Sequence, residues 1–247
     1  MKYKVYIHAL NGWPIADWAV SAYMGFKEKQ MDIIFFEDIN EVPASKYNIV
    51  VSFIEDTNKF LAKIGVGPKM ALNIPHELHQ QKYLGRDIRF TDMGNFRKAV
   101  NSAQELKPVF IKPNRRSKEF IAGVMTMKET IHAFKDVEDD TPILLSDVVN
   151  FESEYRGYVI GGVLKGLKHY QGDFFVFPDT DVIMSAIRDY KSAPAGYSID
   201  FGVTDGGKTL LVECNDGFSL GNYGLEHSIY ANLLLRRWME MTNHIDR

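Results

Sequence analysis

The chain has 247 residues, of which 45% are hydrophobic and 25% are charged, and its formal net charge is −3. This composition is typical of a globular protein with one sizeable domain or two coupled domains, and it provides no basic field for bulk nucleic-acid binding. The single cysteine, Cys214, excludes an internal disulfide framework and a cysteine-based zinc cluster. Because the sequence has no signal-peptide core and no apolar run of membrane-spanning length, we expect a soluble cytoplasmic protein without a membrane partner.

The first part of the chain alternates between strands and helices. Short apolar segments that are typical of strands occur at residues 4–8, 32–36 and 47–53. Between the first two, Trp18, Ala22 and Phe26 form one stripe of an amphipathic helix. A polar helix that stops at Gly85 and a linking helix at residues 94–106 follow. The alternation predicts a small α/β layer.

Beyond residue 106 the pattern changes to strands that are separated by loops. Strands are expected at residues 109–113, 143–149, 155–160 and 163–170. A helix is expected at residues 180–190, where Ile183 and Ile187 share one face, and a closing helix at residues 225–241. We therefore place a domain boundary near residue 106, with an amino-terminal α/β domain at residues 1–105.

A hairpin with a Gly-Gly turn at residues 206–207 is the most informative local feature. A two-residue loop at this position pairs Asp200 directly with Glu213, and strand alternation places Asn215 on the same face. Two carboxylates that face each other repel unless a cation lies between them. The three oxygen-donating side chains predict a site for Mg²⁺ that is shared with nucleotide phosphates, and a polar face washed by solvent is the alternative.

The same hairpin also fits the phosphate-loop pattern, because residues 202–209 read Gly-x-x-x-x-Gly-Lys-Thr. That motif requires a helix directly after the loop, so that amide groups at the start of the helix converge on phosphate. The segment that follows, residues 210–214, is apolar and typical of a strand. We therefore interpret Lys208 as a turn residue and not as a phosphate ligand.

The order of the elements resembles the ATP-grasp superfamily over about residues 75–240. The motifs that carry the resemblance are Lys112 at the end of an apolar strand, a lid loop, an apolar strand that leads into a hinge at residues 144–149, the acidic Glu154, and the series Asp200, Glu213 and Asn215. The resemblance implies an ATP-grasp fold, in which two α+β subdomains clamp ATP, preceded by a small α/β domain. It divides residues 106–247 into a lid subdomain at 106–145 and a metal-binding subdomain at 146–247.

Within that superfamily the chain resembles a divergent clade. The clade includes phage and bacterial proteins and the eukaryotic assembly protein of a translation initiation factor. The matching segments are residues 83–86, 110–113, 118–123, 154–156 and 215–224. The lid departs from ordinary ATP-grasp ligases, because residues 114–118 read Asn-Arg-Arg-Ser-Lys where glycines and serines are usual. We expect basic side chains to replace main-chain amides over the γ-phosphate.

The resemblance implies which residues bind the phosphates, the adenine and the ribose of ATP. Lys112 is expected to neutralise α- and β-phosphate oxygens, and Lys118 to reach down from the lid. The main chain of Asp147 and Val149 is expected to contact adenine, and Glu154 to accept the ribose hydroxyls. The alternatives are a solvated charge for Lys118 and an ordinary loop carboxylate for Asp147.

Two arginines are candidates for the reacting groups. Arg156 follows Glu154 by two residues and therefore shares its face, and in similar ligases an arginine here stabilises an acyl-phosphate. The alternative for Arg156 is a structural ion pair with a carboxylate. Arg86 is expected to contact phosphate or substrate, and its alternative is to cap the helix that ends at Gly85.

These assignments predict an ATP- and Mg²⁺-dependent carboxylate–amine ligase that acts through an acyl-phosphate. Its partners are ATP and an unidentified carboxylate and amine, with a peptide or protein acceptor as one expectation. The alternatives are an assembly chaperone that binds ATP without ligation and an ATP-grasp kinase. The substrate itself has no readable sequence pattern, because the residues that face it come from loops.

Overall fold

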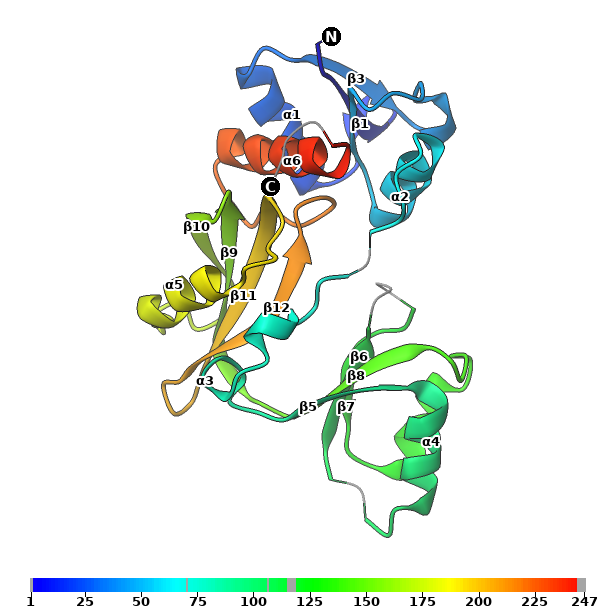
Figure 1. The fold of residues 1–247 in the computed structure, drawn as a ribbon, viewed down its shortest axis with the longest axis vertical. Coiled ribbons are helices and arrows are strands. Elements are labelled where there is room, and N and C mark those ends of the chain that lie inside the picture. Colours follow the sequence, from blue (N-terminus) through cyan, green and yellow to red (C-terminus); the bar gives the residue numbers. More distant parts are fainter. Residues whose placement is uncertain (1, 70, 106, 115–118, 244–247) are drawn as a thin grey trace.

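The computed structural model describes residues 2–69, 71–105, 107–114 and 119–243. Within these residues the strands form three four-stranded sheets, which follow one another along the chain (Figure 1). No helix in the described part of the chain is long and apolar enough to cross a membrane.

The first sheet is a small α/β layer, as predicted. Its strands are β1 (Lys4–Leu10), β2 (Trp13–Pro14), β3 (Asp32–Phe36) and β4 (Asn48–Val51). Both β3 and β4 run parallel to β1, and every residue of β4 is buried, which is typical of a parallel strand that is covered on both faces. The covering helices are α1 (Asp17–Glu28), α2 (Ile54–Lys63) and the short 3-10 helix η1 (Ile39–Glu41).

The last helix, α6 (His227–Met241), packs against α1 and so joins the end of the chain to its beginning (Figure 1). The close approach of the two helices requires Gly25 in α1, because a Cβ atom there would overlap the main chain of His227. Trp238 of α6 is 1% exposed, and its Nε1 donates a hydrogen bond to the main-chain oxygen of Lys46 at 2.9 Å. The carboxyl-terminal helix is therefore part of the core of the first sheet.

The second sheet is antiparallel, with the order β5-β8-β6-β7. Its strands are β5 (Ile88–Asp92), β6 (Val109–Pro113), β7 (Gly123–Met125) and β8 (Pro142–Asp147). The helices that pack on it are α4 (Met93–Ser102) and the 3-10 helix η3 (Lys128–Phe134). The sheet therefore begins at Ile88, whereas we expected the boundary near residue 106. The reason is that β5 pairs with β8, a strand some fifty residues later. The local pattern of apolar residues does not indicate which distant strand a segment pairs with.

The third sheet is also antiparallel, with the order β10-β9-β11-β12. Its strands are β9 (Phe151–Ile160), β10 (Val163–Gly172), β11 (Gly196–Thr204) and β12 (Thr209–Asp216). The shorter helices near it are η2 (His76–Leu78), α3 (Gln81–Leu84) and α5 (Thr180–Asp189). The polar helix expected before Gly85 is thus split into η2 and α3, although Gly85 ends it in the left-handed conformation, at φ +56°.

The β11–β12 hairpin has the predicted pairing of Asp200 with Glu213 but not the predicted turn. The last pair before the turn is Val203 with Thr209, and the turn closes through Gly207 at φ +74°. A β-bulge at Val212 then shifts the register by one residue. The prediction of a two-residue Gly-Gly loop was therefore wrong. The bulge compensates for the longer turn, so that Asp200 still pairs with Glu213.

Candidate functional site

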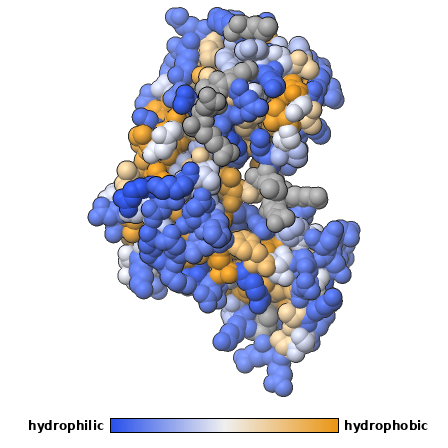
Figure 2. All heavy atoms as spheres, in the orientation of Figure 1, coloured by the Kyte–Doolittle hydropathy of each residue, from blue (hydrophilic) through white to orange (hydrophobic). Residues whose placement is uncertain are grey.

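A cavity of about 340 Å³ lies between the second and third sheets, within the range of ligand-binding pockets. Figure 2 shows hydrophobic side chains between these two sheets, and other hydrophobic patches in the upper part of the view. The predicted site residues that line the cavity are Arg86, Lys112, Asp147, Val149, Glu154 and Glu213. Lys118 lies outside the described residues. The two sheets thus bring together, over the 127 positions from Arg86 to Glu213, groups that were predicted for the nucleotide, the metal ion and the reacting groups.

Lys112 and Glu213 join the two sheets at this cavity. Lys112 is near the end of β6 and is 8% exposed, and its Nζ donates a hydrogen bond to Oε2 of Glu213 on β12 at 2.9 Å. The other carboxylate oxygen, Oε1, accepts a hydrogen bond from Nδ2 of Asn215 at 3.0 Å. Burial favours the neutral form of Glu213, but Lys112 and Asn215 outweigh it and hold the pKa of Glu213 below its usual value. Glu213 is therefore an anion at neutral pH.

Arg156 and Asp200 form a bidentate ion pair beside Glu213. They are cross-strand neighbours on β9 and β11, and the guanidinium donates from Nε to Oδ1 at 2.9 Å and from Nη2 to Oδ2 at 2.6 Å. Asp200 is 1% exposed, and burial raises the pKa of its carboxyl to about 6 against the opposing effect of Arg156. The structure thus shows for Arg156 the ion pair that was the alternative to a role at the acyl-phosphate.

The residues predicted for Mg²⁺ fit a hard cation in chemistry, because Asp200, Glu213 and Asn215 all offer oxygen. Their carboxylate oxygens accept hydrogen bonds from Arg156 and Lys112, which supply the positive charge between the two facing carboxylates. Among the described residues no cluster of three histidine, cysteine, aspartate or glutamate side chains could hold a metal ion. A bound Mg²⁺ therefore has to share these oxygens with Lys112 and Arg156 or displace the two side chains.

Arg86 is bound mainly to the main chain. Its Nη1 donates to the main-chain oxygens of Leu84 at 3.1 Å and Leu211 at 2.8 Å, and its Nε donates to Oγ of Ser146 at 3.0 Å. Because Leu84 is the last residue of α3, this arrangement matches the helix-capping alternative. Burial lowers the pKa of the Arg86 guanidinium, and the charge of Asp147 opposes that shift. Arg86 thus fixes α3, β8 and β12 around the cavity wall.

Sequence reasoning missed two tyrosines at this site. The hydroxyl of Tyr170 donates to Oε2 of Glu154 at 2.6 Å, and the ring of Tyr170 stacks on the ring of Tyr223 at a centroid distance of 5.1 Å. The guanidinium carbon of Arg156 is 4.9 Å from the centroid of the Tyr223 ring. Tyr170 lies in a β-bulge between the pairs made by His169 and Gln171, so that strand alternation alone could not have placed it.

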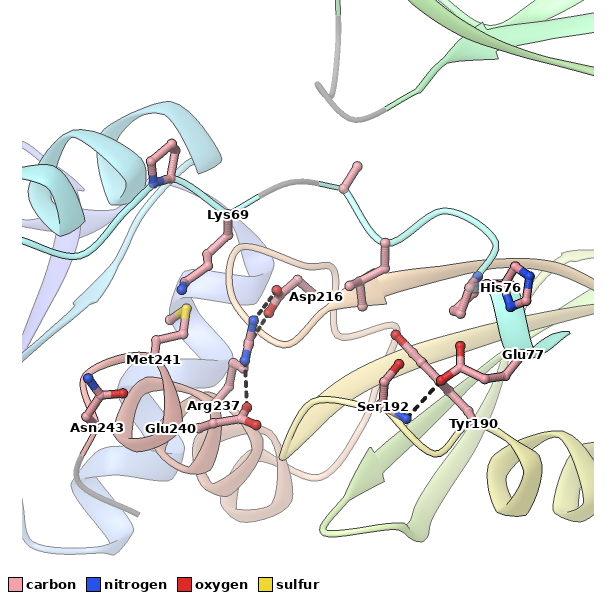
Figure 3. A pocket seen from close by; sticks show the side chains of 14 residues that line it. Lys69, His76, Glu77, Tyr190, Ser192, Asp216, Arg237, Glu240, Met241 and Asn243 are labelled. Carbon is pink, nitrogen blue, oxygen red and sulfur yellow. Dashed lines mark hydrogen bonds and ion pairs between the residues drawn. The ribbon is translucent and has the colours of Figure 1, made fainter. Parts of the chain in front are cut away.

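A second, smaller cavity of about 180 Å³ lies next to Arg156 and Asn215. It is continuous with a larger open hollow of about 780 Å³, because Lys69, Ala71, Leu72 and Asp216 line both. Figure 3 shows the hollow, with Lys69 extending into it from the segment that follows α2 and with Arg237 held between Asp216 and Glu240. The 780 Å³ hollow shares no lining residue with the cavity between the two sheets and is therefore separate from it.

Comparisons with known proteins agree with this architecture. A family model described as "ATP-grasp domain, R2K clade family 2" matches residues 83–233, more than half of the chain. A D-alanine–D-alanine ligase from Bacillus anthracis has a similar structure, with a TM-score of 0.59 at 10% identity over 99% of both chains. The N5-carboxyaminoimidazole synthetase from Staphylococcus aureus gives a TM-score of 0.62 at 8% identity, over 96% of this chain and 78% of its own.

A RimK domain ATP-grasp protein from Sphaerobacter thermophilus gives a TM-score of 0.61 at 12% identity, over 94% of this chain and 99% of its own. A search of curated proteins found no match. At such low identities the solved structures establish the fold alone, and they confirm the predicted ATP-grasp fold. The chain belongs to the R2K clade of ATP-grasp domain proteins, family 2.

Proposed function

We propose that the protein is an ATP- and Mg²⁺-dependent carboxylate–amine ligase that works through an acyl-phosphate. The observation that carries the proposal is the contact between Lys112 and Glu213, which joins the second sheet to the third at the edge of the 340 Å³ cavity. A cation near the end of a strand that faces a carboxylate is suited to hold phosphate oxygens together with a divalent metal ion. The ligases with similar folds support the proposal.

The nucleotide is proposed to lie in the cavity between the sheets. Adenine would contact the main chain of Asp147 and Val149, near apolar side chains such as Phe110 and Phe151. Glu154 would accept the ribose hydroxyls, and Lys112 would bind the phosphates. Mg²⁺ would be held by Asp200, Glu213 and Asn215, and when bound it supplies positive charge to the phosphate oxygens.

Arg156 is proposed to orient the substrate carboxylate. Its guanidinium is fixed by Asp200, lines the 180 Å³ cavity, and has no hydrogen-bond partner for Nη1 among the described residues. A guanidinium that is held on one edge and open on the other is preorganised to bind a carboxylate or a phosphate. The ion pair and the proposed catalytic role are therefore compatible.

The acid to be activated is proposed to lie in this smaller cavity, with its body in the hollow of Figure 3. The ammonium group of Lys69 makes no ion pair or hydrogen bond with another described residue, whereas the charge of Arg237 is balanced by Asp216 and Glu240. Lys69 is therefore available to a negatively charged ligand. The size of the hollow, about 780 Å³, favours an acid with an extended body, such as a peptide or a protein segment.

The reaction consists of two substitutions. A carboxylate oxygen of the acid attacks the γ-phosphorus, and the bond from that phosphorus to the bridging oxygen breaks, so that ADP leaves. The amine nitrogen then attacks the acyl carbon, phosphate leaves with the electron pair of the carbon–oxygen bond, and the nitrogen loses a proton. The chain therefore needs no nucleophilic side chain of its own.

The test is to incubate the protein with ATP, Mg²⁺, a library of short peptides and hydroxylamine. A ligase forms ADP together with a peptide hydroxamate, because hydroxylamine intercepts the acyl-phosphate, and mass spectrometry identifies the hydroxamate. Glu213→Gln is the control for contaminating activity. ADP with a stable phosphorylated product and no hydroxamate would show a kinase instead, and tight ATP binding without any ADP would show a chaperone.

A further inference from the structure

We propose that Tyr170 is a positioning residue that makes the nucleotide site select ribose over a sugar that lacks the 2′- and 3′-hydroxyl groups. The inference rests on the proposed function, in which Glu154 receives the sugar of ATP. Tyr170 itself contacts Glu154 and Arg156, and it is not among the residues that line the 340 Å³ cavity. It acts by holding Glu154 in one orientation.

The hydroxyl group of Tyr170 donates a hydrogen bond to one of the two carboxylate oxygens of Glu154. It donates to Oε2 at 2.6 Å, and Oε1 has no hydrogen-bond partner among the described residues. The bulge in β10 produces this contact, because Gln171 is the residue that pairs with Glu154 and Tyr170 is the extra residue before it. Burial raises the pKa of Tyr170, as do the charge of Asp200 and the bond to Glu154, so that the hydroxyl stays protonated and remains a donor.

The ring of Tyr170 is itself held in place. It stacks on the ring of Tyr223 at 5.1 Å with an interplanar angle of 21°. The guanidinium carbon of Arg156 is 5.8 Å from the centroid of the Tyr170 ring and 4.9 Å from that of Tyr223, and Asp200 fixes the guanidinium in turn. The orientation of Glu154 is therefore determined by a chain of contacts that begins at a buried ion pair.

A carboxylate that is fixed in advance discriminates between sugars. Its free oxygen accepts a hydrogen bond from a ribose hydroxyl without a loss of side-chain freedom at the time of binding. A sugar without hydroxyl groups leaves the same oxygen desolvated and without a donor, and such a mismatch is more costly than the loss of an ordinary contact. If Glu154 were free to rotate toward solvent, it would escape that penalty, and selectivity would fall.

The test compares the affinities of ATP and 2′,3′-dideoxy-ATP, each with Mg²⁺, by calorimetry. We expect the unmodified protein to bind ATP about tenfold tighter than the dideoxy analogue. Tyr170→Phe, which keeps the ring and removes the hydroxyl, should weaken ATP about fivefold and change the affinity for the analogue less than about twofold. Tyr223→Leu, at a side chain that is 46% exposed, should give the same pattern with a smaller loss.

Tyr155→Phe is the matched control. Tyr155 is on the same strand as Glu154, and its hydroxyl donates to the main-chain oxygen of Phe174 at 3.0 Å, away from the cavity. It should leave both affinities unchanged. Equal weakening of ATP and the analogue by Tyr170→Phe would overturn the inference and leave the proposed function intact, as would equal affinities in the unmodified protein. Failure of the unmodified protein to bind ATP at all would overturn the proposed function itself.

Discussion

Asp200 and Glu213 lie directly opposite each other on the β11–β12 ladder, and each is bound by a cation from a different strand. Arg156 on β9 neutralises Asp200, and Lys112 on β6 neutralises Glu213. Lys112 belongs to the second sheet, whereas the other three residues belong to the third. The site is therefore a group of four alternating charges, and the contact across the two sheets is part of it.

Nucleotide binding should stabilise the protein in a metal-dependent manner. At a hundredfold excess of ATP over its dissociation constant, the free energy of unfolding should rise by about 2.7 kcal/mol, which raises the melting temperature by roughly 5–10 °C for a chain of this size. EDTA should remove most of the gain in melting temperature, because without a divalent cation the negative charges of the three phosphates repel the carboxylate of Glu213. Identical melting curves with and without ATP would contradict the assignment of the cavity.

Glu213→Gln should abolish most of the catalytic activity. The substitution removes a negative charge from the proposed metal site, and we expect a loss of about a thousandfold in rate, equivalent to roughly 4 kcal/mol. Lys112, which is 8% exposed, also loses its counter-ion, so that the folded state should lose about 1–2 kcal/mol but persist. Steady-state ADP formation and urea unfolding measure the two effects. Full activity in this variant would show that the face is not catalytic.

The stability of the protein should depend on Glu213 in a defined pH range. Because the pKa of Glu213 is lower in the folded state than its ordinary value, the unfolded chain binds more protons at acidic pH. The stabilisation is therefore complete above the ordinary glutamate pKa of about 4.3 and is lost as the pH falls through the lower folded value. Urea titrations between pH 7 and pH 3 should show the difference between the unmodified protein and Glu213→Gln shrinking with acidity. A difference that grows with acidity would refute the ion pair.

Arg156→Ala should destabilise the protein strongly. It leaves the carboxylate of Asp200, which is 1% exposed, without a counter-ion, and breaking a buried pair from one side costs about 3–5 kcal/mol. The double substitution Arg156→Ala with Asp200→Ala should therefore cost less than the sum of the two single substitutions. Lys2→Ala is the control, because its partner Asp32 is 3.7 Å away and both side chains are mostly exposed. Additive costs in the double variant would indicate that Asp200 is not held by Arg156.

Several strand positions in this chain follow from local sequence, because the pattern of apolar residues is a local property, whereas β2, β5 and β7 had no counterpart among the expected strands. β3 was predicted at its observed bounds, and β1 within two residues at its end. The pairing of Asp200 with Glu213 was also correct, but two unforeseen features cancelled, namely a longer turn and the bulge at Val212. A bulge depends on the packing of neighbouring strands, which a two-strand model does not contain.

The partners of the site residues could not be predicted in the same way. The ion pair of Arg156 with Asp200 requires β9 to lie beside β11, and this strand order is set by the whole sheet. The main-chain contacts of Arg86 likewise depend on α3 lying against β12. Helix α2 had no counterpart among the expected elements. Residue types thus predicted which charged groups lie near the cavity, whereas tertiary topology determined which of them form pairs.

The central claim, that the cavity between the second and third sheets binds ATP, is tested most directly by calorimetric titration of two lysine variants. Lys112 is buried at the cavity and bound to Glu213, whereas Lys208 is an exposed residue of the β11–β12 turn. Lys112→Ala should weaken ATP·Mg²⁺ binding by about ten- to a hundredfold, the equivalent of one charge-assisted phosphate contact, and Lys208→Ala should change it by less than about twofold. Loss of binding in Lys208→Ala with normal affinity in Lys112→Ala would contradict the account and favour a phosphate loop at the hairpin.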